Sequence, residues 1–380
     1  MKQEIRRQLK FRPDGGFKII QITDIQDSVN ISTDTINFID AVLEKEKPDL
    51  VVFTGDQIMG YSPSLRKADA SEKIKYVIDS IIAPLAKHNT LFTITFGNHD
   101  VQSKLPLKEQ LEFYMNYPQC LAYDTEGLPG CANHNLTILS SDGSKTAFNL
   151  YMIDSLGSKS GGEYEAVSTE QVDWYRQTRD QLKKDNFGEY VPSLLFQHIP
   201  VEEIYNLFKE VKKRTKGSMP AYRKRKGKTF ALNMDIVNKD GFWGELPCVP
   251  DDNFGEFEAA SEKGDILGIY FGHDHKNCFY GNYKGVDLGY TPGCGFNVYG
   301  PRFKRGVRIF ELNENEPQKY STRVVHYFDI FGKKIKSPLK CYLLDKSPTS
   351  FEDALAKIKT LLLGLAVIAV LVVLIVKYLL

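Results

Sequence analysis

Two histidines stand one residue apart in the stretch "FGHDH" (271–275). The whole chain holds only 7 histidines, so the pairing of His273 with His275 needs a reason. In a β-strand, side chains two residues apart point to the same face. Two imidazoles on one face repel each other when charged, and when neutral they occupy buried surface without a polar partner. Binding to a metal ion removes both disadvantages. The pair therefore predicts a metal site, provided that the rest of the chain supplies the remaining ligands.

Other candidate ligands follow short apolar runs that are rich in β-branched and aromatic residues. They are Asp24, Asp56, Asn98 and His198. A single Asp after a strand is most often part of a turn or a helix cap, and a single His is most often packed. However, groups at the carboxyl ends of strands converge on one crevice in open α/β sheets. Five such strand ends together predict one shared site.

The runs that carry these residues predict strands buried on both faces. They span 17–24, 49–56, 91–100, 148–154, 192–198 and 266–275. Helical patterns at 33–46, 70–87 and 168–185 alternate with them. The first helix has an N-cap-like Thr33, and the last opens with a capping box from Ser168 to Gln171. This alternation predicts an α/β layered fold, with antiparallel strands in the glycine- and aromatic-rich region after residue 266.

The ordered motifs resemble those of the calcineurin-like metallophosphoesterases. They read "DIQ" (24–26), "GDQIMG" (55–60), "GNHD" (97–100), "QH" (197–198) and "GHDH" (272–275). The family pattern is D-x-H, G-D-x-x, G-N-H-[DE], a lone His and G-H-x-H. The resemblance covers about Phe17 to Phe310, and "GHDHKNCFYGNYKGVDLGY" is most similar to the atypical purple-acid-phosphatase-like branch and related microbial phosphohydrolases. It implies a two-sheet α/β sandwich of four layers that carries a two-metal centre.

The resemblance also implies a role for each matching residue. The metal ligands are a bridging Asp56, Asp24 and His275 on the first ion, and Asn98, His198 and His273 on the second. His99, oriented by Asp100, protonates or stabilises the leaving oxygen. Two divalent ions (Mn, Fe, Zn or Mg) about 3.5–4 Å apart acidify a bridging water, and the hydroxide attacks the phosphorus in line.

The chain departs from the family pattern at Gln26, where a histidine is usual. An amide oxygen is a weaker ligand than imidazole for Zn²⁺ but suits harder ions such as Mn²⁺ or Mg²⁺. Three interpretations stay open. Gln26 ligates the first ion through oxygen, or it stands behind the ligands while water or Asp27 replaces it, or the first site is weak and the protein is a degenerate relative.

The C-terminal segment differs sharply from the rest of the chain. Residues 360–380 are apolar except for Lys377, and as a helix they span roughly 30 Å at about 1.5 Å per residue. We therefore expect residues 354–380 to form a single transmembrane anchor. The segment before it is rich in lysine. The positive-inside rule therefore predicts that this segment and the catalytic domain lie on the cytoplasmic side. The N-terminus has no apolar stretch typical of a secretory signal.

Composition narrows the remaining choices. The chain is 42% hydrophobic and 26% charged with a net charge of +1, so we expect a globular domain and no nucleic acid partner. The 6 cysteines contain no C-x-x-C pair and are expected to be reduced and mostly packed. We expect a metallophosphoesterase domain at 1–330 and a basic linker at 331–353. The basic stretch 209–230 is either a solvated insertion or a flap that contacts substrate or anionic lipid.

These features predict a membrane-tethered, metal-dependent hydrolase of a phosphomonoester or phosphodiester. Two alternatives stay open. One is a metal-poor, non-catalytic sensor or scaffold for a phosphate ligand at the membrane, which Gln26 alone supports. The other keeps the chemistry but takes a lipid-linked phosphate or pyrophosphate, which the predicted anchor and the basic stretch support.

Overall fold

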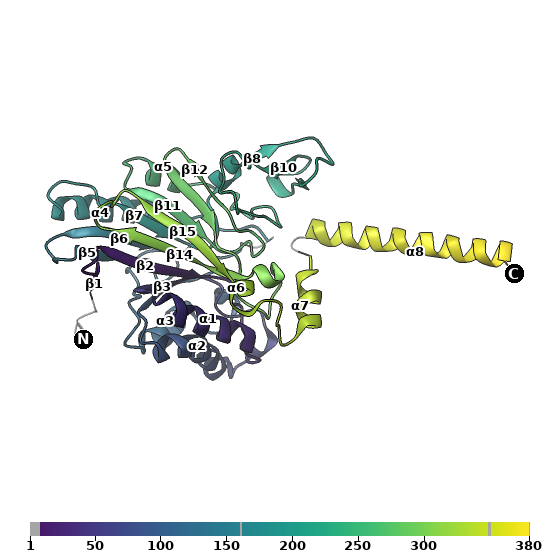
Figure 1. Ribbon diagram of the computed structural model, residues 1–380, viewed down its shortest axis with the longest axis horizontal. Coiled ribbons are helices and arrows are strands. Elements are labelled where there is room, and N and C mark those ends of the chain that lie inside the picture. Colours follow the sequence, from purple (N-terminus) through teal and green to yellow (C-terminus); the bar gives the residue numbers. More distant parts are fainter. Residues whose placement is uncertain (1–7, 160–161, 349–350, 380) are drawn as a thin grey trace.

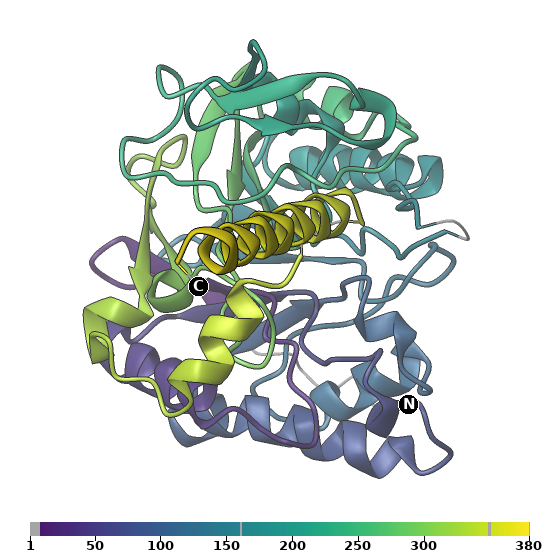
Figure 2. The same ribbon diagram turned by 90° about the vertical axis from the view of Figure 1, so that its right-hand side faces the viewer.

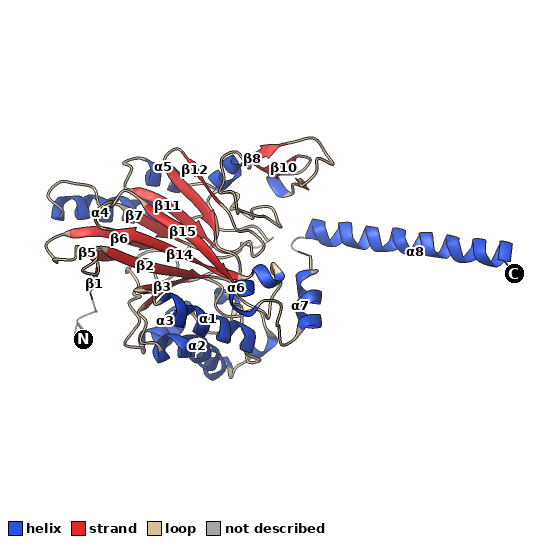
Figure 3. Ribbon diagram, viewed as in Figure 1, coloured by secondary structure: helices blue, strands red, loops and turns tan. Residues whose placement is uncertain are grey.

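Two β-sheets lie face to face in the computed structural model, which describes residues 8–159, 162–348 and 351–379. Helices cover the outer face of each sheet, so that four layers follow one another across the domain (Figure 1). Figure 3 shows the two sheets in the middle of this stack and the helices outside them. The two-sheet α/β sandwich predicted from the sequence is confirmed.

The first sheet has five strands and carries the first three predicted ligand positions. In spatial order its strands are β15 (Tyr320–His326), β14 (Gly306–Asn313), β2 (Gly16–Ile22), β3 (Leu50–Thr54) and β4 (Phe92–Thr95). Strands β2, β3 and β4 are parallel, whereas β14 runs antiparallel to β2 and to β15. The carboxyl ends of β2, β3 and β4 therefore lie at one edge of the sheet.

The second sheet has seven strands and carries the other ligand positions. In spatial order its strands are β1 (Leu9–Lys10), β5 (His134–Leu139), β6 (Thr146–Met152), β7 (Ser193–Phe196), β11 (Ile266–Phe271), β13 (Val286–Tyr290) and β12 (Tyr280–Tyr283). Strands β6, β7, β11 and β13 are parallel, and β12 and β13 form the antiparallel pair expected after residue 266.

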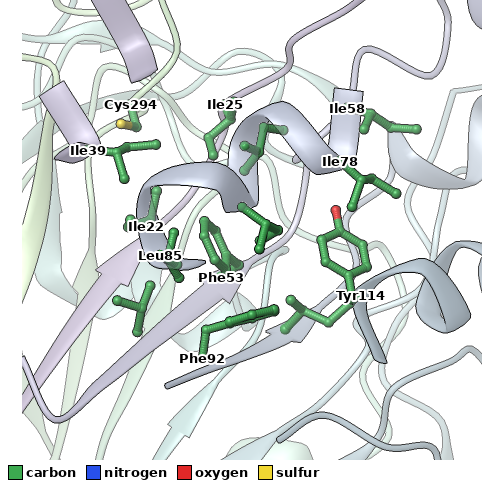
Figure 4. Packing of buried hydrophobic residues seen from close by; sticks show 14 of the residues in the cluster. Ile22, Ile25, Ile39, Phe53, Ile58, Ile78, Leu85, Phe92, Tyr114 and Cys294 are labelled. Carbon is green, nitrogen blue, oxygen red and sulfur yellow. The ribbon is translucent and has the colours of Figure 1, made fainter. Parts of the chain in front are cut away.

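Alternating side chains along the central strands separate the layers. Val51 and Phe53 point toward the outer helices, whereas Leu50 and Val52 pack against the second sheet. The helices on the first sheet are α1 (Thr33–Glu46), α2 (Ala70–Lys87) and α3 (Leu107–Met115), and those on the second are α4 (Thr169–Asp185) and α5 (Glu256–Ser261). Figure 4 shows how Phe53 and Phe92 of the sheet meet Ile78 and Leu85 of α2.

Local sequence signals set the helix starts. Ser168 and Gln171 form the predicted capping box at α4, with both reciprocal hydrogen bonds present. At α1 the N-cap is Ser32, whose hydroxyl accepts from the backbone N–H of Thr35 at 3.3 Å. Thr33, predicted as the N-cap-like residue, is instead the first helical residue.

The basic stretch 209–230 lies within a small third sheet. Its strands are β8 (Phe208–Glu210), β10 (Thr229–Leu232) and β9 (Met219–Pro220), and Figure 1 places it at the far side of the second sheet from α1 and α2. The described chain also contains short 3₁₀ helices: η1 (Pro63–Leu65), η2 (Asp100–Gln102), η3 (Glu202–Leu207), η4 (Arg223–Arg225) and η5 (Arg302–Lys304).

The segment expected to be a linker contains structure that packs on the domain. Helix α6 (Tyr327–Phe331) is followed by α7 (Pro338–Asp345), in which Cys341 and Asp345 are buried. The guanidinium of Arg305 donates to Asp345 at 3.0 Å and to the carbonyls of Gly295 and Val298 at 2.6 Å. Helix α7 is therefore joined to the turn that follows β13.

Helix α8 (Phe351–Leu379) extends away from both sheets in Figure 1 and is seen foreshortened in Figure 2. In the part of the chain that the structure describes, no helix is both long and apolar enough to cross a membrane. The predicted transmembrane anchor is therefore not supported. Side chains of α8 are described for 354–355, 357–359 and 362–373, so the side chain of Lys377 lies outside this description.

Candidate metal centre

The predicted ligands meet where strands of both sheets end. They are Asp24 after β2, Asp56 after β3, Asn98 after β4, His198 after β7, and His273 and His275 after β11. All six side chains are buried. Ligand atoms of Asp24, Asp56 and His198 lie within 4.8 Å of one another. The rings of His198 and His273 are 5.1 Å apart, and Asp24 Oδ1 lies 3.2 Å from His275 Nε2. Their role as metal ligands stays a prediction.

The turns that carry these residues have unusual backbone geometry. The φ angles of Asp24, Gln26, Asp56 and His273 are 53°, 41°, 55° and 71°, in the left-handed region that non-glycine residues rarely occupy. Such conformations persist where the surrounding structure enforces them, and they cluster at functional sites. At Gly272 a Cβ would stand 1.9 Å from Thr23 Oγ1, so only glycine allows His273 to approach Asp24 this closely.

Several buried acceptor atoms in this site have no hydrogen-bond partner among the described residues. They are Asp24 Oδ1, Asn98 Oδ1, His198 Nε2 and His273 Nε2, of which Asp24 Oδ1 lies 3.2 Å from His275 Nε2 and His198 Nε2 lies 3.2 Å from Asp56 Oδ2 as ion-pair contacts. The Nδ1–H of His198 donates to the carbonyl of Thr54 at 2.9 Å, and that of His275 donates to the carbonyl of Tyr299 at 2.8 Å. These bonds turn Nε2 of each ring into the site, as outer partners do for metal-ligating histidines. The donor set of carboxylate, amide oxygen and imidazole therefore fits a divalent cation.

Electrostatics point the same way. Burial lowers the pKa of His198, but the negative charge of Asp56, 3.2 Å away, outweighs it and raises that pKa to about 10. Burial favours the neutral form of Asp56, yet His198 and His99 hold its pKa well below the ordinary value. Burial, with the charge of His198, lowers the pKa of His273 well below its usual range. The site thus favours a positive charge beside Asp56.

Gln26 lies between the two halves of the predicted first ion site. Its Nε2 is 2.9 Å from Asp56 Oδ2 and 3.0 Å from His275 Nε2, and its Oε1 accepts from the Tyr61 hydroxyl at 3.2 Å. Asp27, the predicted substitute ligand, turns elsewhere and accepts from the backbone N–H of Ser32 and from Asn297. The structure thus places Gln26, and not Asp27, inside the centre.

His99 stands at the mouth of the site and is partly exposed. Its backbone N–H donates to Asp56 Oδ1 at 2.8 Å, and its ring Nδ1 lies 2.9 Å from Gln102 Oε1. The ring packs edge-on against Tyr61 at 4.7 Å. Its Nε2 is 3.9 Å from Asp56 Oδ2, so the free edge of the imidazole faces the centre.

Asp100, predicted to orient the imidazole of His99, is instead hydrogen-bonded to the backbone of two turns. The buried Asp100 carboxylate accepts from three backbone N–H groups, those of Asp56 at 2.8 Å, Gly97 at 2.9 Å and Ile58 at 3.0 Å. Because these donors use its oxygens, Asp100 ties the β3 and β4 turns together. Burial and the charge of Asp56 raise the pKa of Asp100 to about 8.

Three residues of the site were missed in the sequence. Tyr61 and Gln102 contact Gln26 and His99, and Tyr299 stacks on His275 with ring centroids 4.2 Å apart. Of these three, only Gln102 could have been recognised from the sequence, because a residue three positions after His99 shares its face in a helical turn. Tyr61 and Tyr299 act through long-range contacts that no local pattern encodes.

A second group of possible ligands shares His273 with Cys248 and Asp274. Asp274 already accepts from the Tyr290 hydroxyl at 2.6 Å and from the backbone N–H of Cys248 at 3.1 Å. Burial raises the pKa of the Cys248 thiol well above its usual value, which disfavours the thiolate that binds metals. The group around Asp56 is therefore the better fit.

Space for a substrate lies next to the turn after β4. A cavity of about 330 Å³ is lined by Gly97, Val101, Asp154, Leu156 and Glu165 among others. Arg223 of η4 stands over the ring of Tyr164 at 4.9 Å, and that ring packs edge-on against His273 at 4.6 Å. The basic stretch thus reaches residues that contact the centre.

The four-layer α/β sandwich and the Asp–Asn–His cluster at the strand ends define the architecture of a metallophosphoesterase. A family model described as calcineurin-like phosphoesterase matches residues 17–277, and the chain belongs to this family. The family expected from the motifs is thereby confirmed.

The individual relatives described next are 28% identical to this chain or less. The chain is 28% identical over 344 residues to a probable inactive purple acid phosphatase 14 from Arabidopsis thaliana, covering 80% of this chain and 77% of that protein. It is 28% identical over 226 residues to the phosphatase DCR2 of Saccharomyces cerevisiae, covering 53% of this chain and 37% of that protein. A crystal structure of a dimetal phosphatase from Danio rerio aligns at 12% identity with a TM-score of 0.48, covering 82% of this chain and 99% of that one.

Proposed function

We propose that the protein hydrolyses a phosphomonoester or phosphodiester in a metal-dependent reaction at the centre around Asp56. One observation carries the proposal: ligand atoms of Asp24, Asp56 and His198 lie within 4.8 Å of one another, and the buried Asn98 Oδ1 and His273 Nε2 at neighbouring strand ends have no hydrogen-bond partner in the described chain. Unpaired polar groups in an interior are unfavourable unless a ligand satisfies them. Membership of a phosphoesterase family supports the reaction class.

The proposed ligand roles are those that the family motifs imply. Asp56, between the two sets, would bridge two ions, with Asp24 and His275 on one side and Asn98, His198 and His273 on the other. When bound, divalent ions supply Lewis-acid stabilisation of the charge that develops on the phosphoryl oxygens. Asp100 keeps the turn of Asp56 and the turn of Asn98 in register through its three backbone bonds.

His99 is the proposed general acid. Gln102 Oε1 accepts from its Nδ1–H, which leaves Nε2 as the nitrogen that exchanges a proton with the leaving oxygen. The backbone bond to Asp56 Oδ1 and the edge-on contact with Tyr61 hold the ring at the mouth of the centre. The cavity of about 330 Å³ beside Val101 is the proposed place for the organic part of the substrate.

The experiment removes metal from the full chain with a chelator and restores it with Mn²⁺, Fe²⁺, Zn²⁺ or Mg²⁺. Hydrolysis of p-nitrophenyl phosphate and of the bis-ester is then measured together with metal content. We expect Asp56→Ala to lose both metal and turnover. We expect His99→Ala to keep its metal and to lose about 10²–10⁴-fold in rate, the usual contribution of a general acid. Substantial turnover by Asp56→Ala, or no turnover by the wild type with any ion, would contradict the proposal.

A non-catalytic sensor or scaffold for a phosphate ligand is the second candidate. The bonds of the Gln26 amide to Asp56 and His275 favour it, because they use atoms that an ion would need. Metal bound without turnover, together with binding of inorganic phosphate, would select this candidate. Hydrolysis of a lipid-linked phosphate or pyrophosphate would instead appear as a preference for micellar over soluble esters.

Attachment to a membrane, with the domain on its cytoplasmic side, stays a prediction. Its support is the exposed apolar surface of α8, where Leu362, Ile368 and Val373 are 59%, 58% and 64% exposed. Co-sedimentation of the full chain with phosphatidylcholine vesicles tests it, and a chain ending at residue 348 is the control. Equal sedimentation of both chains would contradict it.

A further inference from the structure

The amide group of Gln26 contacts two residues of the same predicted ion site. Its Nε2 lies 2.9 Å from Asp56 Oδ2 and 3.0 Å from His275 Nε2. An amide nitrogen carries two N–H donors and no lone pair for a metal. With a neutral His275 whose Nε2 accepts, one donor serves the carboxylate and the other serves the imidazole. The amide thus bonds to the atoms that, with Asp24, would face the first ion.

The neighbours of Gln26 determine which way its amide points. The Tyr61 hydroxyl donates to Oε1 at 3.2 Å, and the Nδ1–H of His275 is used by the carbonyl of Tyr299. In the neutral imidazole, Nε2 of His275 is then an acceptor. An amide turned the other way would set its oxygen against two acceptors, the carboxylate of Asp56 and this lone pair.

The backbone also holds Gln26 in this place. Its φ of 41° lies in the left-handed region, and its N–H donates to the carbonyl of Asp56 at 2.8 Å. The side chain is buried, so the two amide bonds form away from water. The backbone conformation of the turn therefore holds Gln26 in the centre, and its contacts there are buried and not loose surface contacts.

The other half of the centre is different. Within the described chain, Asn98 Oδ1, His198 Nε2 and His273 Nε2 have no hydrogen-bond partner. A cation entering there breaks no hydrogen bond of Asn98 Oδ1 or His273 Nε2 and replaces only the 3.2 Å ion-pair contact of His198 Nε2 with Asp56. A cation entering the Asp24–His275 side must first displace the Gln26 amide from Asp56 and from His275.

From this asymmetry we propose that Gln26 makes the two halves of the centre unequal. One divalent ion binds firmly at Asn98, His198 and His273, with Asp56. A second ion binds on the Asp24–His275 side only when the Gln26 amide leaves Asp56 and His275, and the rotated amide then presents Oε1 as an additional, weak ligand. The second site then prefers oxygen-seeking ions such as Mn²⁺ or Mg²⁺ over Zn²⁺. The inference rests on the proposed metal-dependent function and deepens it, because ion concentration would regulate the centre.

Metal stoichiometry tests the proposal without any activity assay. The full chain is equilibrated by dialysis against a series of free Mn²⁺ concentrations at mildly alkaline pH, and bound metal is measured by mass spectrometry. We expect the wild type to bind one ion firmly and a second at least about tenfold more weakly. Gln26→His supplies an imidazole in place of the amide, and we expect it to tighten the second ion by about 10–100-fold. Electron paramagnetic resonance separates an isolated Mn²⁺ from an exchange-coupled pair.

Two further variants keep the test decisive. Gln26→Ala removes the amide without adding a ligand, and Tyr61→Phe removes only the hydroxyl that holds Oε1. Both should strengthen the second ion relative to the wild type and leave the first unchanged. Two ions of equal affinity in the wild type, or no effect of Gln26→Ala on the second ion, would overturn the inference and leave the phosphoesterase proposal intact. A wild type that binds no ion at any concentration would overturn both.

Discussion

Replacing Asp345 by alanine should destabilise the domain strongly, because it removes the counterion of a buried arginine. Asp345 Oδ1 accepts from both terminal nitrogens of Arg305 at 3.0 Å and from the backbone N–H of Gly300 at 3.1 Å. Arg305 is fully buried. In the variant its guanidinium keeps hydrogen bonds to the carbonyls of Gly295 and Val298 and lies 4.9 Å from the centre of the Phe296 ring, but it has no counterion among the described residues.

The magnitude follows from what is lost. Removing one partner of a buried ion pair costs about 3–5 kcal/mol. The two remaining carbonyl bonds place this case at the lower end, about 3 kcal/mol, and the unpaired N–H of Gly300 adds about 1 kcal/mol. Asp345→Asn keeps an acceptor oxygen and should cost roughly half as much, since charge-assisted bonds are about twice as strong as neutral ones.

Urea unfolding of the full chain, followed by tryptophan fluorescence, measures these differences in the free energy of unfolding. Glu316→Ala is the control, because Glu316 pairs with Lys319 on the surface and such pairs contribute at most about 1 kcal/mol. A loss below about 1 kcal/mol for Asp345→Ala would refute the reasoning. So would equal losses for the alanine and asparagine variants, since the retained oxygen would then make no difference.

Two other predictions concern charge. Burial raises the pKa of Glu256 to about 8, so between about pH 4.3 and pH 8 the folded state holds a proton that the unfolded state has released. The contribution of this group to the free energy of unfolding is complete below about pH 4.3 and is lost as the pH rises through about 8. Glu256→Gln should therefore match the wild-type melting temperature in acid and exceed it above pH 8, and equal pH profiles would count against this explanation. Arg223→Ala should raise KM for phosphoester substrates by about 10–100-fold with little change in kcat, because Arg223 Nη1 is buried without a hydrogen-bond partner in the described chain. Arg225→Ala, whose guanidinium pairs with Glu202 at 2.6 Å, is the control, and an equal rise in KM would contradict a specific role for Arg223.

The strands and the convergence of the ligands could be predicted from the sequence because both are local signals. Apolar runs with a polar residue at their carboxyl ends imply buried parallel strands whose ends share an edge, and the structure has this arrangement at Asp24, Asp56 and His198. The capping box at Ser168 was equally local. These features depend on residues that are neighbours in the chain.

The orientation of polar side chains could not be predicted in the same way. Asp100 turns away from His99 because the backbone N–H groups of Asp56, Ile58 and Gly97 take up its carboxylate, and those groups come from two different turns. The burial of α7 likewise depends on Arg305, which is 40 residues from Asp345 in the chain. From its composition alone, "GKKIKSPLKCYLLDKSPTS" resembles a solvated linker, and nothing local reveals its buried partner.

The division of the centre between two sheets affects when it forms during synthesis. The first sheet's contribution is Asp24, Asp56 and Asn98, which are made early and offer only oxygen ligands. The imidazoles of His198 and His275 come from strands that are made later and belong to the other sheet. A nascent chain therefore lacks the full set of predicted oxygen and nitrogen ligands until both sheets have folded and docked. Selection of the proposed metal would then wait for the finished domain, and an ion bound there would link the early half of the chain to the late half.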